Sequence, residues 1–499
     1  MSPAPGVAPR QRRVPHSPPE PYHTERSTLY VDVDGTLIYT DLLFESVVVL
    51  IKRNPLYALM CVFWLLSGRG RLKAEIATRV NLDVSHLLYN EQFLAYLKQE
   101  RADGRRLVLA SASDRRLVLQ VADHLGIFDA VMGSDESINL KSTVKLRTIQ
   151  NDAAGRGFAY AGNSSADLPI WAAAEEVIVI NASPGLIRQA SALQVPALVI
   201  PARPVTLRLV SKAMRIYQWA KNALLFVPLI AAHDLTPAKW RATLLAFVAF
   251  GLCASATYVI NDLLDLASDR AHPRKRARPF AAATLSIPFG VMLIVILLPL
   301  SMWLALMVSP QFLALLGLYT VTTLAYSMRL KRVAIVDTLV LALLYTLRIL
   351  AGGVAAGVMV SNWLLAVSLF MFLGLALVKR CTELEFMHDA GRDALTGRGY
   401  RSTDLPYLIS MGISSGFVAV MVLALYIDSQ AGGFMYPHAE ILWLMLPVML
   451  YWIMRLWIKT SRMEIHDDPL MFAIRDPASW AVGFAIGCIA LGASVRFVP

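Results

Sequence analysis

The chain contains little cysteine and little charge for its length. Its four cysteines among 499 residues lie far apart in the sequence, so we expect neither a disulfide framework nor a cysteine-rich metal site. Charged residues make up only 17% of the chain and hydrophobic residues 56%, which is too apolar for a single soluble domain. Residues 1–27 lack an apolar stretch, so we expect a disordered tail there and no signal peptide.

Long apolar runs recur from Leu207 onward, and each has about the length that crosses a bilayer as a helix. We predict about nine spans, near residues 219–232, 240–260, 286–307, 312–327, 336–358, 362–379, 406–426, 439–457 and 477–497. The net charge is +11, and the loops after the second, fourth, sixth and eighth spans are rich in Lys and Arg. This asymmetry predicts a multi-pass protein of the inner (cytoplasmic) membrane with those loops in the cytoplasm, and it makes nucleic acid a poor partner.

Three aspartates follow the second predicted span. Asp262, Asp265 and Asp269 are spaced i, i+3 and i+7, so on a helix they share one face. Mg²⁺ takes oxygen ligands and commonly bridges a few carboxylates to substrate phosphates, so the motif predicts a Mg²⁺-diphosphate site rather than a solvated helix end. Neighbouring polar and basic residues suit the outer phosphate oxygens. These further candidates are Asn261, Arg270, Lys275 and Arg278.

The stretch from Asn261 to Pro279 resembles the first aspartate-rich motif of the UbiA superfamily of membrane prenyltransferases, and most of all its decaprenyl-phosphate phosphoribosyltransferase branch. Tyr326, Lys331 and Asp337, at the connection from the fourth to the fifth predicted span, are similar to the second motif of that branch. The resemblance implies a nine-helix bundle that uses Mg²⁺. It also implies that Lys331 contacts phosphate and that the carboxylate of Asp337 binds the metal or a ribose hydroxyl. The alternative for Lys331 is a plain loop anchor.

Polar residues also occur within the apolar half of the chain. Lys221 and Asn222 begin the first predicted span, and Arg348 lies inside the fifth. A cation or an amide in such a helix is costly unless it faces protein, water or ligand, so we expect these side chains to bind substrate. Asp468, before Pro469, is expected to cap a helix rather than to bind a ligand.

Acidic residues also end the first strand that the sequence predicts. Asp32 and Asp34 follow a β-branched run, and Gly35 lets a phosphate approach the backbone. A second buried strand ends at Ser111, and Asp114 is expected to cap the helix that follows.

This pattern resembles the haloacid dehalogenase (HAD) superfamily of phosphatases. The resemblance implies that Asp32 is the nucleophile, that Asp34 is the acid and base, and that Ser111 holds phosphate. It implies a neutralising lysine, for which Lys145 is the better match and Lys141 the alternative. It also implies a Mg²⁺ site at Asp32, Asp34 and Asp167, in which Asn163 replaces the usual first acid of the fourth motif.

The sequence therefore predicts two domains, an N-terminal α/β HAD-like (Rossmannoid) domain and a C-terminal all-α membrane bundle. We expect the HAD-like domain at 28–200, with a cap at about 39–99, then a linker at 201–212 and the bundle at 213–499. The apolar run 56–66 is too short to span and is expected to lie in the membrane interface.

The resemblance implies phosphoribose transfer from phosphoribosyl pyrophosphate (PRPP) to a polyprenyl phosphate, and the HAD-like domain suggests dephosphorylation of the product. One alternative is transfer from a prenyl diphosphate to an aromatic or quinone acceptor. Another is a transporter or a membrane-anchored phosphatase. In each case the lipid bilayer is a partner.

Overall fold

The computed structural model describes residues 26–135, 139–234, 236–389, 398–429, 436–465 and 468–494. The expected tail at 1–27 therefore lies almost wholly outside the described residues. The chain divides into two compact units. The first comprises residues 1–42, 67–78 and 89–202, and the second comprises residues 43–66, 79–88 and 203–499.

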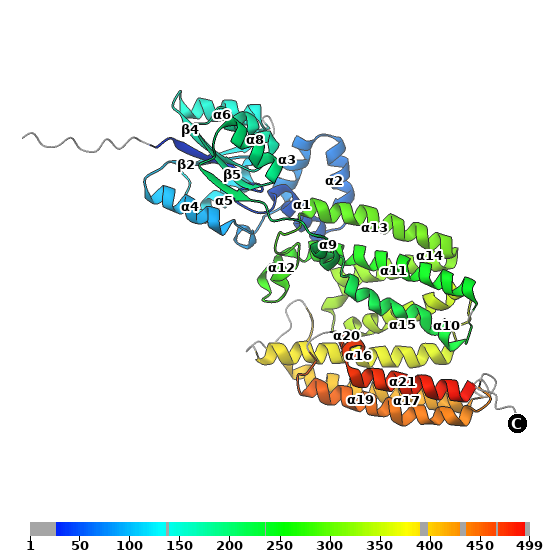
Figure 1. Cartoon of the computed structure of the whole chain (residues 1–499). Helices are drawn as coiled ribbons and strands as arrows, with labels where there is room; N and C mark the ends of the chain where they lie inside the picture. The colour runs from blue at the N-terminus through cyan, green and yellow to red at the C-terminus, as the bar shows by residue number, and fades with distance from the viewer. Residues whose placement is uncertain are drawn as a thin grey trace, which may run out of the picture. The chain divides into compact units, whose positions relative to one another are not determined.

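The first unit is built on a six-stranded parallel sheet in the order β3-β2-β1-β4-β5-β6 (Figure 1). The strands are β1 (Thr28–Val31), β2 (Leu107–Asp114), β3 (Ala130–Ser134), β4 (Phe158–Gly162), β5 (Glu176–Ala182) and β6 (Leu198–Pro201). The helices of this unit include α4 (Glu91–Ala102), α5 (Arg115–Leu125), α6 (Thr143–Ala153), α7 (Leu168–Trp171) and α8 (Pro184–Leu193). Strands β2, β4 and β5 are almost continuously buried, as in a parallel sheet covered on both faces, whereas the edge strands β3 and β6 are more exposed.

The segment expected as a cap is shared between the two units. It contains α1 (Leu42–Arg53), α2 (Tyr57–Leu66), α3 (Arg69–Arg79) and η1 (Val84–His86) before α4. Residues 43–66 and 79–88 group with the second unit, whereas 67–78 groups with the first. In α2 the side chains of Leu59, Phe63 and Leu66 are 72%, 59% and 83% exposed, which suits the expected place in a membrane interface.

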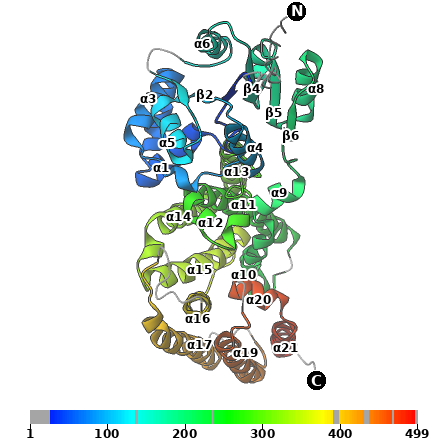
Figure 2. The same ribbon diagram turned by 90° about the vertical axis from the view of Figure 1, so that its left-hand side faces the viewer.

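The second unit contains eight helices, among the described residues, that are long and apolar enough to cross a membrane. They are α11 (Pro237–Leu264), α13 (Ile287–Val308), α14 (Pro310–Met328), α15 (Val336–Ala356), α16 (Asn362–Asp389), α17 (Leu405–Asp428), α19 (Met445–Ser461) and α21 (Pro477–Ser494). They run side by side in Figure 1, and Figure 2 views α16 nearly end-on between α15 and α17. Eight of the nine predicted spans are therefore long helices.

The first predicted span, near 219–232, has a different structure. A short helix, α9 (Leu207–Ala213), leads into a 3₁₀ segment, η3 (Ile216–Phe226), and the five-residue helix α10 (Val227–Ala231). Pro228 supplies no backbone N–H, and Lys221 and Asn222 are buried polar residues, so a regular apolar helix is not favoured here.

Short elements connect the long helices. They are α12 (Leu266–Ala271), η4 (Lys275–Ala277), η5 (Leu330–Arg332), η6 (Ser402–Asp404), η7 (Ala439–Leu444) and α20 (Pro469–Arg475). Because successive long helices alternate in direction, the segments after α11, α14, α16 and α19 lie at one end of the bundle. That end, marked by α12 in Figure 1, carries the acidic motif and Lys331.

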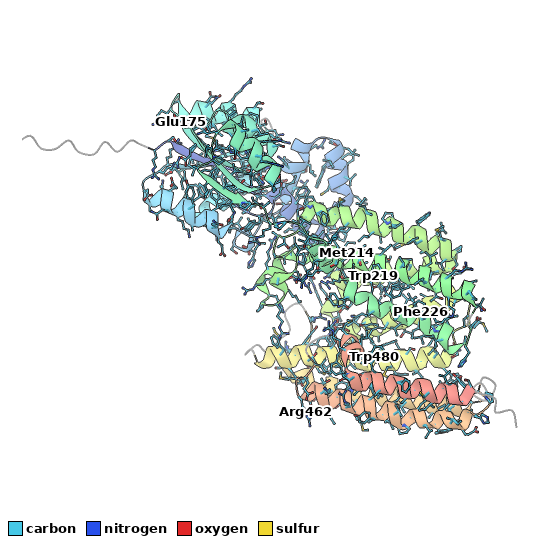
Figure 3. The ribbon with its side chains drawn as sticks, viewed as in Figure 1. Glu175, Met214, Trp219, Phe226, Arg462 and Trp480 are labelled. Atoms are coloured by element: carbon cyan, nitrogen blue, oxygen red, sulfur yellow. The ribbon has the colours of Figure 1, made fainter. Side chains whose placement is uncertain are left out.

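The 3₁₀ segment η3 packs tightly into the bundle. The ring of Trp219 contacts Phe247 of α11 and donates its indole N–H to Ser255 at 2.9 Å (Figure 3). On α15, a Cβ atom added at Gly352 would lie 2.0 Å from the carbonyl oxygen of Leu225. Because position 352 has no side chain, η3 can approach α15 closely. This close approach keeps the polar residues of η3 inside the bundle.

Replacing Gly352 with Ala should destabilise the bundle, because the added methyl group collides with backbone atoms that cannot rotate away. Overpacking of this kind costs about 1–3 kcal/mol, and the midpoint of thermal unfolding in detergent should fall accordingly. Gly483→Ala in α21, where an added Cβ meets nothing within 4 Å, is the matched control. Equal midpoints for the two variants would contradict the close approach of η3 and α15.

Candidate functional site

Two acids follow β1, a central strand of the parallel sheet in the first unit. Strand β1 lies between β2 and β4, so the carboxyl ends of three strands meet beside Asp32 and Asp34. Asp32 is 8% exposed and accepts the backbone N–H of Val33 at 2.9 Å. Burial raises the pKa of Asp32 to about 7, although the nearby Lys145 acts in the opposite direction.

Asp34 is bound by hydroxyl groups from the end of β2. One of its carboxylate oxygens accepts hydrogen bonds from Ser111 at 3.2 Å and Ser113 at 2.6 Å, and the other accepts the N–H of Leu42 at 2.8 Å. Burial raises the pKa of Asp34 to about 6, and these hydrogen bonds oppose the shift. Ser111, predicted to hold phosphate, therefore donates a hydrogen bond to Asp34, the predicted acid. The structure places Ser113 there as well, a residue that the sequence analysis did not predict.

Lys145 joins Asp32 to Asp167 through a tyrosine. Its ammonium group lies 3.1 Å from an oxygen of Asp32 and donates to the hydroxyl of Tyr160 at 2.9 Å. That hydroxyl donates to Asp167 at 2.9 Å, and burial raises its pKa well above the usual value. Lys141, the alternative lysine, is exposed. Sequence analysis missed Tyr160 because its role depends on contacts with residues far along the chain.

Asn163 lies against the loop that follows β1. Gly35 has φ +73°, and a Cβ atom added there would lie 1.9 Å from the amide nitrogen of Asn163. The amide of Asn163 thus occupies the space beside Gly35. Asn163 stands at the position of the fourth motif where the resemblance implies an acid. Asp114 accepts the N–H of Arg116 at 3.0 Å and caps α5, which confirms that prediction.

In the second unit, Asp262 and Asp269 share a cation. Both are 2% exposed, and the Arg278 guanidinium lies 3.2 Å from Asp262 and 2.6 Å from Asp269. Arg215, which lies over the ring of Tyr258, also pairs with Asp262. The helix breaks between Leu264 and Leu266, so the expected helical face is formed by two helices, α11 and α12, instead of one.

Asp265 lies at this break, and its side chain is 19% exposed. It accepts a hydrogen bond from Lys331 at 2.8 Å, and its backbone N–H donates to the carbonyl of the half-buried Asn261 at 2.9 Å. Burial, reinforced by the charge of Arg278, lowers the pKa of Lys275. Lys331 and Arg278 therefore contact the three acids, and Lys275 lies nearby in the sequence in η4. Binding of phosphate by these residues stays a prediction.

Arg270 is placed differently from its expected phosphate contact. Its guanidinium pairs with Glu45 at 2.6 Å, and both side chains are 6% exposed. It also donates to the carbonyl of His86 at 3.3 Å. All three residues belong to the second unit. Arg270 thus anchors a segment from early in the chain, and the sequence offered no signal for a pairing across 225 positions.

Asp337 also differs from its expected role as a ligand. It is fully buried and accepts hydrogen bonds from Tyr326 at 2.7 Å and Arg398 at 3.1 Å. Arg380, itself fully buried, donates to the same carboxylate at 3.1 Å and also pairs with Glu383. Tyr326 and Asp337 therefore fix the connection between α14 and α15. Lys331 is the member of this motif that contacts the acidic motif.

A second group of polar residues lies deeper in the bundle. It consists of Lys221, Asn222, Arg348, Lys379 and Asp468, and we call it the polar cluster. Asp468 accepts hydrogen bonds from Lys221 at 2.7 Å and Lys379 at 3.2 Å, and it caps α20 as predicted. Burial opposes ionisation of Asp468, but the two lysines hold its pKa well below the usual range.

Arg348 completes the polar cluster. It is 5% exposed and donates to the side-chain oxygen of Asn222 at 3.2 Å and to the hydroxyl of Tyr319 at 3.0 Å. Its guanidinium also lies over the rings of Phe250 and Tyr345. The buried amide nitrogen of Asn222 has no hydrogen-bond partner among the described residues. Lys221, Asn222 and Arg348 are therefore buried against protein, and their expected binding of substrate stays a prediction.

Among the residues that the structure describes, no group of three or more His, Cys, Asp or Glu side chains is arranged to hold a metal ion. The acids at the end of α11 nevertheless fit a hard cation chemically. Asp262 and Asp269 already converge on one positive group, and Asp265 pairs with a partly exposed lysine, Lys331. Asp32, Asp34 and Asp167 offer the same oxygen chemistry in the first unit.

Comparisons with known proteins match both units. The model of the UbiA prenyltransferase family matches residues 223–475, about half of the chain, and a model of haloacid dehalogenase-like hydrolases matches residues 29–172. The protein y4nM of Sinorhizobium fredii is 36% identical over 464 residues, which cover 92% of this chain and 89% of y4nM. Nodulation protein NoeC of Azorhizobium caulinodans is 35% identical over 286 residues, 56% of this chain and 92% of NoeC.

A decaprenyl-phosphate phosphoribosyltransferase of Mycobacterium tuberculosis is 32% identical over 233 residues, 45% of this chain and 76% of that enzyme. Among solved structures, a UbiA homolog from Archaeoglobus fulgidus bound to GPP and Mg²⁺ aligns with a TM-score of 0.45 and 17% identity, over 56% of this chain and 99% of the other. The sequence matches and the eight apolar helices lead to one conclusion: this is an integral membrane protein of the UbiA prenyltransferase family with an N-terminal HAD-like domain.

Proposed function

We propose that the chain transfers the 5-phosphoribosyl group of PRPP to a polyprenyl phosphate. The observation that carries this proposal is the convergence of Asp262 and Asp269 on one cation, with Lys331 bound to Asp265 beside them. Such a site suits a metal-bound diphosphate. The choice of donor and acceptor is supported by the relative from Mycobacterium tuberculosis, whose name specifies phosphoribosyl transfer to decaprenyl phosphate.

In this mechanism the acids, through a metal, and the basic residues directly both bind the pyrophosphate group of the donor. Asp262, Asp265 and Asp269 would hold Mg²⁺, which would supply Lewis-acid stabilisation of the leaving group. Lys331 and Arg278 exchange their carboxylate partners for pyrophosphate oxygens. The bond from the ribose C1 to the pyrophosphate oxygen breaks, its electron pair leaves with pyrophosphate, and an acceptor phosphate oxygen bonds to C1. The acceptor is already anionic, so no strong general base is required.

The polar cluster is the proposed site of the acceptor phosphate. Lys221 and Lys379 offer ammonium groups, and Asn222 has a buried N–H without a partner among the described residues. An anionic oxygen would satisfy that N–H, whose burial without a partner is unfavourable. The prenyl chain would then lie along the apolar helices.

The same reasoning extends to topology and to the N-terminal domain. Positive loops at the end of the bundle that holds the acids favour a cytoplasmic position for that end and for the HAD-like domain. For that domain we propose hydrolysis of the 5-phosphate from the lipid-linked product. Asp32 would attack phosphorus, and Asp34, bound by Ser111 and Ser113, would protonate the leaving oxygen and then activate water.

A second candidate keeps the site and changes the donor. The matched family is named for prenyl transfer, and a prenyl diphosphate presents the same leaving group as PRPP. Purified protein supplied with Mg²⁺ and a polyprenyl phosphate should form a lipid product from radiolabelled PRPP. Product from a labelled prenyl diphosphate and an aromatic acceptor, without product from PRPP, would replace the first proposal with the second.

Replacing Asp262 with Asn should lower the transfer rate by about 10²-fold or more, because the neutral amide removes one of the charges that hold the metal-bound leaving group. The measurement is product formation from labelled PRPP at saturating donor. Asp428→Asn, at an exposed position at the end of α17, is the control and should retain full activity. A matched thermal midpoint for Asp262→Asn shows that the loss is chemical, and full activity of that variant would exclude the acidic motif from the reaction.

Replacing Asp32 with Asn should abolish phosphate release from the phosphoribosyl lipid while leaving its synthesis unchanged. The amide keeps the size of the side chain but cannot act as the nucleophile. Malachite green detection of phosphate measures the first activity, and chromatography of the labelled lipid measures the second. Lys141→Ala, at an exposed position in the same domain, is the control. Phosphate release that survives in Asp32→Asn would refute the proposed hydrolysis.

A further inference from the structure

Helix α1 contributes a basic residue to the acidic motif of the bundle. Lys52 Nζ lies 3.7 Å from one carboxylate oxygen of Asp265, and Lys331 Nζ lies 2.8 Å from the other. Asp265 therefore lies between two lysines that are separated by 279 positions in the sequence (331 minus 52). Residues 43–66 and 203–499 belong to the same compact unit, so this contact lies within one part of the structure.

Two further contacts hold α1 in this position. Phe44 and Val48 pack against the core that Leu263 and Leu266 form beside the acids. Glu45 pairs with Arg270 at 2.6 Å, with both side chains 6% exposed. A buried ion pair is stable only with good geometry, so it fixes the register of the helix. Glu45 and Lys52 are spaced i and i+7 and share one face of α1, which directs Lys52 to Asp265.

We propose that Lys52 is a donor-binding residue of the transferase site, an inference that rests on the proposed function. When Asp265 binds the metal, Lys52 and Lys331 both lose their carboxylate partner while remaining beside it. Two ammonium groups, which contact different oxygens of Asp265 in the structure, are then available to the diphosphate of the donor. The segment between the first two HAD motifs of the sequence thus completes the diphosphate site of the bundle.

The exposure of Lys52 makes a clean test possible. Its side chain is 39% exposed, so Lys52→Ala should fold normally. The KM for PRPP should rise about 5- to 10-fold with kcat nearly unchanged, since a charge-assisted contact to phosphate is lost but solvent screens it in part. Lys52→Arg should recover most of the affinity. Arg53→Ala removes an exposed charge from the same helix and should leave KM unchanged.

A second readout separates this inference from the choice of donor. Mg²⁺ with inorganic pyrophosphate should raise the thermal midpoint of the wild-type protein and of Arg53→Ala, and raise that of Lys52→Ala less. That result without turnover of PRPP would support Lys52 and reject the donor. Turnover of PRPP with the same KM in wild type and Lys52→Ala would overturn the role of Lys52. Neither turnover nor stabilisation of the wild type would overturn both.

Discussion

The structure of the bundle depends on neutralising carboxylates that are buried beside apolar helices. Asp262, Asp269 and Asp337 are each at most 2% exposed, and an unpaired charge at such a depth costs several kcal/mol. Each of them pairs with an arginine, and Asp265 pairs with Lys331. In the reaction that we propose, binding of a metal-diphosphate complex would be an exchange of ionic partners. The acids would pass to the metal and the bases to the phosphates, so no group would be left charged and unpaired.

Several of these polar residues lie in irregular backbone, which a membrane protein tolerates where the backbone is covered by protein. Asp262 and Asp269 lie on either side of the break between α11 and α12, and both pair with Arg278. On a continuous helix these two residues would be about two turns apart. The 3₁₀ segment η3 places Lys221 and Asn222 inside the bundle, and Gly352 gives it room. The departures from regular helix therefore coincide with the polar positions.

The sequence predicts the features that depend on local pattern. The length of apolar runs locates eight long helices, and the order of motifs identifies both families. It also predicts Lys331 and Arg278 at the acids. It does not predict that Arg270 pairs with Glu45, or that arginines 380 and 398 enclose Asp337, because these contacts depend on tertiary packing between distant segments. The first span differs from its predicted helix because the prediction relied on the length of the apolar run. That criterion gives little weight to the two polar residues, Lys221 and Asn222, and to Pro228.

The pKa of Asp32, in the first unit, shifts in the opposite direction from that of Asp468. Asp468 is buried between two lysines, and its pKa is lowered, whereas burial prevails at Asp32 and raises its pKa to about 7. Asp167 and Asp34 add to this increase through like charge. Asn163 therefore has two opposing effects. An aspartate at that position would add another negative charge near the acids that follow β1 and would disfavour the ionised form of Asp32, which the proposed hydrolysis needs. The amide avoids that repulsion, and it would be a weaker ligand than a carboxylate for the metal of that proposal.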